Sequence, residues 1–315
     1  MNGTPFPRNT VWFTAALGCL LLTLSTSLPA KQGSIMSNTV TYTSTVADEH
    51  FATKLLITPD GLGKLSLGSN RDHRDRSIGQ FQQLIPAAML QNLASTVNGL
   101  EFANSPSQQT LVPDESFREI KLITPDQQQT VKMIGEELPT PAIFGKAEQA
   151  IQEIINYLQK FPLLSVSMRV LPLPPLVDAG KTVNIDIVLR NLGRTPYFIE
   201  SPKDWGKQAT HCELKAIRSD IPLAELKSQH QVFVQLDGSA FIKPESQQND
   251  APLGLMPGEQ IGLRFQHQID WAPGQYDIDI SLALTVFNKD KKALFIGGMV
   301  SPPLAIKVQI PDEKI

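Results

Sequence analysis

The sequence predicts an α+β protein with two parts, an N-terminal domain of two strand–strand–helix (ββα) units and a C-terminal all-β sandwich. A five-residue sequence at Leu56 recurs 66 residues later at Leu122, and the pattern around it recurs as well. The second half instead shows short segments with a period of two, which is typical of half-buried strands. A length of 315 residues also suits two domains.

The repeat defines the N-terminal domain, expected over residues 48–162. Each copy of Leu-Ile-Thr-Pro-Asp ends an apolar strand at a Pro-Asp turn, and a second strand and a helix follow. Two such units would form a four-stranded antiparallel sheet with both helices on one face. The other face of this sheet would then be open to solvent or to a partner.

Two apolar stripes at helical spacing predict the helices of these units. The first stripe is Leu90, Leu93, Val97 and Leu100, with Pro86 at the first turn and Gly99 near the end. The second is Ala147, Ile151, Ile154, Ile155 and Leu158. Each stripe needs a sheet to cover it.

The N-terminus is typical of a secretory signal. Arg8 precedes an apolar run from Val11 to Leu24, and small residues lead to Ala30. We expect residues 1–30 to form a signal peptide cleaved after Ala30, because the run is shorter than the roughly twenty residues that cross a bilayer. The mature protein would then be periplasmic or extracellular, with residues 31–47 as a polar, flexible leader.

An alternative is lipid attachment at Cys19. The sequence Ala16-Leu17-Gly18-Cys19 resembles a bacterial lipobox, although the apolar run continues beyond the cysteine. Otherwise Cys19 is a small apolar residue of the signal. Contact with the membrane is thus expected only through the signal or such an anchor.

The second half begins with a Pro-rich linker and a first strand over residues 163–181, and a β-sandwich domain follows over residues 182–315. The segment Thr182 to Arg190 alternates inward-facing Val183, Ile185, Ile187 and Leu189 with outward-facing residues. Further strands are expected at Tyr197 to Glu200, Cys212 to Ile217, Val232 to Leu236, Ile261 to Ile269, Tyr276 to Phe287, Ala293 to Gly297 and Leu304 to Ile310.

Both parts resemble known bacterial domains. The segments LLITPDGLGKLSLG, PAAMLQNLASTVNGLEF, EIKLITPDQQQTVKMIG and AEQAIQEIINYLQ give residues 48–161 an order of elements similar to emfourin, a bacterial inhibitor of a thermolysin-like metalloprotease. The turns Met256-Pro257-Gly258 and Ala272-Pro273-Gly274, each next to a strand, resemble those of bacterial immunoglobulin-like sandwiches, including the type in an intracellular proteinase inhibitor. The first resemblance implies a protease-inhibitory role.

The residues that carry chemistry form no known catalytic or metal-binding motif. His211 beside Cys212 would need His230 or His267 to build a metal or thiol site; the alternative is that Cys212 points inward and His211 outward. We therefore expect no catalytic residue, cofactor or metal. A net charge of −3 without clustered basic residues also argues against nucleic acid as a partner.

Two loops are candidates for binding. Trp205 lies in a predicted loop, where it is either an exposed protein contact or a lid on the core. The segment Arg71-Asp72-His73-Arg74-Asp75-Arg76 mixes both signs of charge, so it is either a solvated loop or a binding site with little net field.

Three classes of function remain open. We expect an exported, non-enzymatic protein-binding module, and the resemblance to emfourin implies a protease inhibitor whose partner is an extracellular protease. The alternative is a structural or assembly protein of the bacterial cell envelope, with an envelope protein as its partner. An enzyme of unrecognised type is the third, and it would need titratable groups that converge in a pocket.

Overall fold

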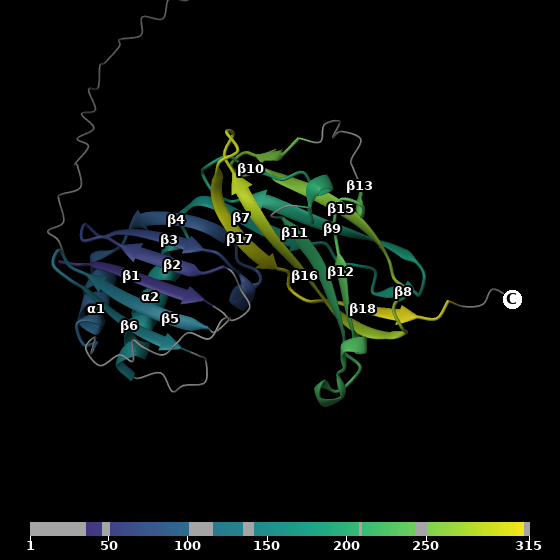
Figure 1. Cartoon of the computed structure of the whole chain (residues 1–315), viewed down its shortest axis with the longest axis horizontal. Coiled ribbons are helices and arrows are strands. Elements are labelled where there is room, and N and C mark those ends of the chain that lie inside the picture. The colour runs from purple at the N-terminus through teal and green to yellow at the C-terminus, as the bar shows by residue number, and fades with distance from the viewer. Residues whose placement is uncertain are drawn as a thin grey trace, which may run out of the picture. The chain divides into compact units, whose positions relative to one another are not determined.

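A computed structural model describes residues 36–45, 51–100, 116–134, 142–207, 210–242 and 251–311 (Figure 1). These residues belong to one compact unit, Ser34–Ile315. The expected signal peptide, its cleavage at Ala30 and the lipidation candidate Cys19 lie outside the described residues. No helix in the described segments has the length and apolar character needed to cross a membrane.

The described part of the chain is mostly β-structure with two α-helices. The N-terminal part contains β1 (Thr39–Thr45), β2 (Thr53–Ile57), β3 (Leu62–Leu67), β4 (Ile78–Leu84), α1 (Ala87–Val97), β5 (Phe117–Ile123), β6 (Gln128–Ile134) and α2 (Ala142–Leu158). The remainder contains β7 (Pro162–Val170), β8 (Leu176–Asp178), β9 (Thr182–Asn191), β10 (Tyr197–Ile199), β11 (His211–Arg218), β12 (Gln231–Gln235), β13 (Phe241–Ile242), β14 (Leu253–Leu255), β15 (Gln260–Gln268), β16 (Gly274–Phe287), β17 (Ala293–Val300) and β18 (Leu304–Gln309).

The strands form two sheets. The first has ten strands in the order β13-β15-β9-β7-β4-β3-β2-β1-β5-β6. The second has eight, built around the long strand β16, which pairs with β10, β11, β17 and β18. Nearly all neighbours are antiparallel, and β8 with β18 is a parallel pair.

The expected four-stranded sheet is not confirmed, because two further strands take part. Strand β1 lies between the two repeat units and pairs with β2 on one side and β5 on the other. Strand β4 pairs with β3 and with β7. The two hairpins of the repeat therefore belong to a larger sheet and do not pair with each other.

Strand β1 differs from the expectation of a flexible leader over residues 31–47. In Thr39–Thr45 the side chains of Val40 and Tyr42 are buried, and threonines alternate with them. Threonine is β-branched and suits a pleated, half-buried surface, so a polar, Thr-rich segment forms a central strand. The composition suggested a leader, whereas the period of two indicated the strand.

The repeated hairpins close in different ways. In the first, Gly61 adopts a φ of 81°, and the Thr58 N–H donates to the Leu62 carbonyl at 3.0 Å. In the second, Gln127 replaces the glycine, and the Thr124 N–H donates to the Gln127 carbonyl at 2.9 Å. Glycine tolerates this left-handed conformation, so the first turn has one more residue between its hydrogen-bonded residues than the second turn has.

Both helices pack with their predicted stripes against the N-terminal part of the first sheet. Leu90, Leu93 and Val97 of α1 are buried, as are all five stripe residues of α2. They form one apolar cluster with strand residues such as Leu55 and Leu65. Figure 1 shows both helices behind the sheet formed by β1 to β6.

A second apolar cluster fills the space between the two sheets and makes this part a β-sandwich. It contains Ile185, Ile187 and Leu189 of β9 and Ile278, Ile280 and Leu282 of β16. The strands expected from residue 182 onward all form, with ends that differ by a few residues. The linker proper is short, because Pro162–Val170 is already strand β7 between β4 and β9.

The ten-stranded sheet is covered on opposite faces at its two ends. Ile78 of β4 lies opposite Val166 of β7 and packs into the sandwich cluster. Phe81, beyond a bulge in the same strand, packs into the cluster under the helices. The expected boundary near residue 163 thus lies between the two clusters but inside one hydrogen-bonded sheet.

Candidate functional site

The face of the N-terminal sheet opposite the helices is the broadest candidate surface, and we call it the open face. Strand register assigns it the side chains that alternate with the buried ones. These are Thr39, Thr41, Thr43, Thr45, Lys54, Leu56, Leu62, Lys64, Ser66, Gln80, Gln82, Phe117, Glu119, Lys121, Ile123, Gln128, Thr130, Lys132 and Ile134. The surface is hollowed, with a volume of about 720 Å³ above it.

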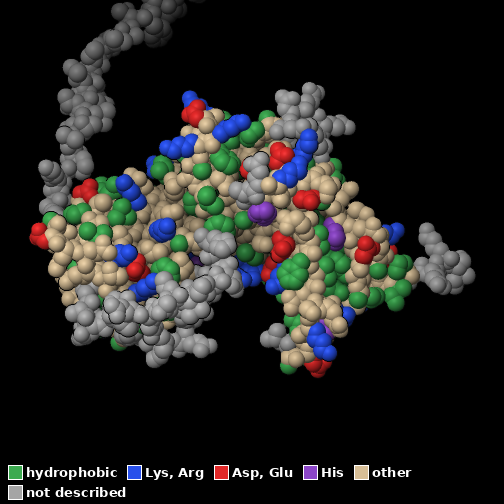
Figure 2. Space-filling view, viewed as in Figure 1, with side chains coloured by type: hydrophobic (Ala, Val, Ile, Leu, Met, Phe, Trp, Pro, Cys, Tyr) green, Lys and Arg blue, Asp and Glu red, His purple; other side chains and the backbone are tan. Residues whose placement is uncertain are grey.

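The open face is positively charged although the whole chain carries a net charge of −3. Four lysines stand against one glutamate, a net of +3, because residues 54, 64, 121 and 132 are Lys and residue 119 is Glu. Lys121 forms an ion pair with Glu119 at 2.9 Å, and the Lys132 ammonium lies 4.1 Å from the Phe117 ring centre. Figure 2 shows basic side chains over this part of the sheet.

Lys54 and Lys64 are the exposed cations of this surface. They occupy adjacent strands, and the register places Lys54 opposite Ser66 and Lys64 opposite Leu56. Within the described residues neither lysine forms an ion pair. Their charges are therefore available to an acidic partner, because an ammonium on a long stem can reach outward from the sheet.

The border of the open face at β4 adds further basic residues. The Gln80 side-chain amide donates to the Leu294 carbonyl at 3.1 Å, which ties the start of β17 to β4. Immediately before it, the β16–β17 turn carries Lys289, Lys291 and Lys292 against Asp290, a net of +2. The Asn288 carboxamide oxygen fixes this turn by accepting from the N–H groups of residues 290 and 292 at 3.0 and 2.9 Å.

The chemistry of this surface suits recognition better than catalysis. Threonine, glutamine and lysine side chains offer hydrogen bonds and positive charge over several strands, and apolar side chains such as Leu56, Phe117 and Ile123 lie among them. The positive potential would attract an acidic surface and would weaken with added salt. Paired strands leave no unpaired backbone groups in the middle of the face, so any contacts would be made by side chains.

Trp205 corrects the prediction of an exposed protein contact. Its side chain is 1% exposed and stacks on Phe265, with ring centres 5.5 Å apart. Its indole N–H donates to the Glu200 carbonyl at 3.2 Å. A short 3₁₀ turn, Pro202–Asp204, precedes Trp205 and turns the large apolar ring inward, so the alternative of a lid on the core is correct.

The histidines considered for a metal or thiol site lie on separate elements. His211 begins β11 of the second sheet, His267 lies on β15 of the first, and His230 ends a 3₁₀ turn before β12. In the described segments no three His, Cys, Asp or Glu side chains gather as a metal site would require.

Cys212 is buried and His211 exposed, the arrangement that a period of two predicts. Burial raises the pKa of the Cys212 thiol, with a smaller contribution from Glu213. The thiol is therefore protonated at neutral pH and is unsuited to nucleophilic chemistry.

In the fold, the side chains of the mixed-charge segment from Arg71 to Arg76 face two different sides. Arg74 points to the sandwich and pairs with Asp279 at 2.5 Å, whereas Arg71, Asp72, His73 and Arg76 line a cavity beside α2. The sequence showed alternating signs, but it gave no indication of which side each residue would face.

Comparisons with known proteins assign no family. No protein-family model matches the sequence, and no curated protein does. Partial matches among solved structures include a Pseudomonas fluorescens alkylpurine DNA glycosylase bound to DNA (10% identity, TM-score 0.26, 53% of this chain and 38% of that one). A second is AvmM, which catalyses macrocyclization in alchivemycin A biosynthesis (13% identity, TM-score 0.27, 48% of this chain and 92% of that one). A third is the CARDB domain of a Pyrococcus furiosus protein (13% identity, TM-score 0.22, 47% of this chain and 90% of that one).

These matches are local. The chain spans 38% of the length of the glycosylase, and all three TM-scores are too low to indicate a shared fold. The activities of those proteins therefore have no bearing on this one.

Proposed function

We propose that this chain is an exported, non-enzymatic protein-binding module that contacts its partner through the open face and the adjoining β16–β17 turn. The observation that carries the proposal is the concentration of exposed lysines, Lys54 and Lys64 above all, on a sheet face that neither helix covers. The partner would present an acidic surface, because complementary charge steers association and fixes orientation.

The location of the protein and the finer class of its fold form part of the same proposal. The apolar run near the N-terminus supports export to the periplasm or the cell exterior. The Pro-Gly turns next to β15 and β16 support an immunoglobulin-like class for the sandwich. Among possible partners we favour an extracellular protease, to which the sequence resemblance to emfourin points.

The test must use the whole protein. A fragment of residues 48–162 lacks β1, the central strand between β2 and β5, and it removes β7 from its place beside β4. The full chain is titrated against purified secreted metallo- and serine proteases while residual protease activity and integrity of the chain are followed. Inhibition near equal stoichiometry, without degradation of the chain, is the expected result.

Two charge-reversal double variants distinguish a specific role of the open face from an effect of the overall net charge. The double variant Lys54→Glu and Lys64→Glu is expected to weaken inhibition at least tenfold and to reduce its salt dependence. The matched control is Lys181→Glu with Lys307→Glu, two exposed lysines of the sandwich, which changes the net charge equally. Equal loss in both double variants would contradict the assignment of the surface.

Failure to inhibit any protease would overturn the inhibitor role. Crosslinking of the full chain in its native envelope would then test the broader proposal. A specific crosslinked envelope protein, lost on reversal of Lys54 and Lys64 but kept in the control, would support binding through the open face and indicate an assembly role. No specific product would overturn the binding module itself.

A further inference from the structure

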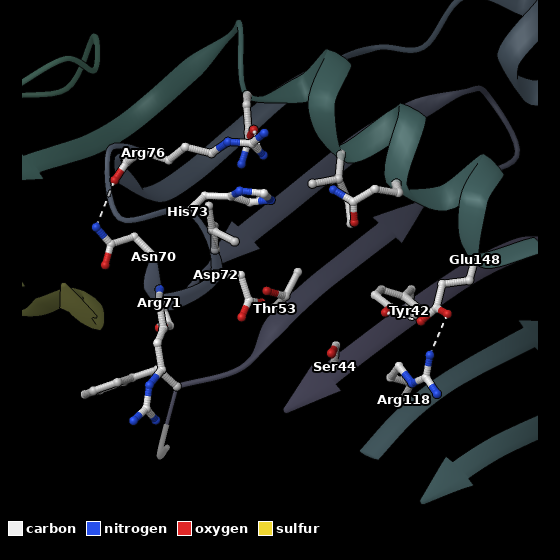
Figure 3. Close-up of a pocket in the computed structure, with 16 residues that line it drawn as sticks. Tyr42, Ser44, Thr53, Asn70, Arg71, Asp72, His73, Arg76, Arg118 and Glu148 are labelled. Carbon is white, nitrogen blue, oxygen red and sulfur yellow. Dashed lines mark hydrogen bonds and ion pairs between the residues drawn. The ribbon is translucent and has the colours of Figure 1, made fainter. Parts of the chain in front are cut away.

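A separate cavity lies between α2, the ends of β1 and β2, and the loop of residues 69–76. Its volume is about 320 Å³, near the lower end of the range of roughly 300 to 1,000 Å³ found for small-molecule sites. Figure 3 shows Tyr42, Ser44 and Thr53 along the sheet, with Asp72 and His73 on the opposite loop. The cavity is on the helix side of the sheet and therefore does not belong to the open face.

The loop that forms one wall is held in place by Asn70. This side chain is 3% exposed, and its amide nitrogen donates to the carbonyls of Arg74 and Arg76 at 3.0 and 3.2 Å. Its oxygen accepts from the Val300 N–H at 2.7 Å. The loop is thus fastened both to itself and to β17, so the cavity is formed before any ligand binds.

The opposite end of the cavity contains a linked group of three polar side chains. The Tyr42 hydroxyl donates to Glu148 Oε1 at 2.9 Å, and Arg118 pairs with Glu148 Oε2 at 2.7 Å. Burial, and then the nearby Glu148 carboxylate, raise the pKa of Tyr42, so its hydroxyl keeps its proton. Arg118 compensates the charge of Glu148, which leaves this end polar and nearly neutral.

The third wall, from α2, adds neutral amides. Gln152 of α2 and Gln159, which directly follows the helix, line the cavity, and Gln159 accepts from Arg76 Nη1 at 3.2 Å. Across the whole lining three arginines stand against two acids, a net of +1 with His73 neutral. The lining therefore contains both hydrogen-bond donors and acceptors on planar side chains, and its net charge is small.

Apolar side chains complete the lining. Phe51, Leu67 and Ile155 contribute carbon surface beside the polar groups. A ligand that fits must have many groups able both to donate and to accept hydrogen bonds, together with exposed C–H groups. Hydroxyl groups have this double capacity, whereas a carboxylate only accepts and an ammonium only donates.

We propose that this cavity binds a neutral, polyhydroxylated ligand of monosaccharide size, with Asp72 and Gln152 accepting from its hydroxyls and Arg76 donating to them. Asp72 extends from the loop and Gln152 from α2, so the two acceptors approach the ligand from different walls. The site is independent of the proposed protein contact, because no open-face residue lines it.

Saturation-transfer NMR on the full chain tests this proposal. The probes are glucose, galactose, mannose and N-acetylglucosamine, with sodium benzoate as an anionic comparison at constant ionic strength. At least one sugar should receive saturation and titrate to a plateau. Asp72→Asn should weaken its binding by about tenfold or more, because a hydrogen bond to a charged acceptor is lost.

The control is Asp75→Asn, which removes the same charge from the same loop at a residue that does not line the cavity. It should bind the sugar as the unchanged chain does. Equal weakening by both variants would overturn the site assignment, and binding of benzoate alone would overturn the ligand class. No binding of any probe at about 50 mM would overturn the proposal, because the dissociation constants usual for specific ligands lie well below that concentration.

Discussion

Asn70 joins its own loop to a strand that lies 230 residues further along the chain. Its side chain holds the carbonyls of Arg74 and Arg76 and exchanges hydrogen bonds with both backbone groups of Val300, the N–H at 2.7 Å and the carbonyl at 3.3 Å. A carboxamide provides both two donor hydrogens and an acceptor oxygen, and few other side chains combine them at this length. One residue thus fixes both the loop and its contact with the sandwich.

Replacing Asn70 by alanine is expected to lower the free energy of unfolding by about 1 to 3 kcal/mol, because buried backbone groups lose their partners. Urea denaturation followed by circular dichroism measures the change. The control Asn184→Ala removes an exposed side chain whose bond to Gln266 is 3.1 Å long, and it should shift stability by no more than about 0.5 kcal/mol. Equal effects would contradict a special role for Asn70.

At the scale of elements, β1 decides the architecture of the N-terminal sheet. It is hydrogen-bonded along both sides, to Thr53–Ile57 and to Phe117–Ile123. Within the sheet, β1 is the strand that joins the two repeat hairpins, while α1 and α2 also pack in one apolar cluster. A strand with partners on both sides tolerates proline poorly, since proline lacks the N–H that the ladder needs.

Thr41→Pro is therefore expected to destabilise the protein by about 3 kcal/mol or more, which thermal denaturation would detect as a lower Tm. The control is Ser37→Pro, an exposed position just before β1. We expect the control to keep the Tm of the unchanged chain. A Tm for Thr41→Pro equal to that of the control would mean that β1 is not integral to the sheet.

At the scale of the whole molecule, the two apolar clusters share one sheet and a second close contact. Gly298 N–H donates to the Gly68 carbonyl at 2.8 Å, where β17 meets the end of β3. A Cβ built on Gly297 would lie 2.8 Å from the Gly68 oxygen, so only glycine permits this approach. Residues of the sandwich therefore help to hold the N-terminal part.

Shared strands and contacts predict cooperative unfolding of the described structure. Differential scanning calorimetry of the full chain should give one transition, with calorimetric and van 't Hoff enthalpies equal. Two resolved transitions, each assigned by the near-ultraviolet signal of its own aromatic residues, would show that the clusters unfold independently. Independent unfolding would mean that the contacts at β4, β7 and β17 contribute little stability.

The sequence by itself determined the local structure wherever periodicity was strong. Both helices, both repeat hairpins and most strands after residue 182 follow from the alternation of buried and exposed side chains, because burial requires that spacing in a helix or a strand; the short strands β13 and β14 were not predicted. The inward position of Cys212 follows for the same reason.

The tertiary structure decided what pairs with what. The place of β1 between the repeats, the inward position of Trp205 and the sorting of charges around Asp72 and Arg74 all depend on contacts between residues far apart in the chain. Such contacts arise when sheets and helices close around a shared core, and no local spacing encodes them. Periodicity indicates which face of a helix or strand is buried, and only the assembled fold determines which elements cover that face.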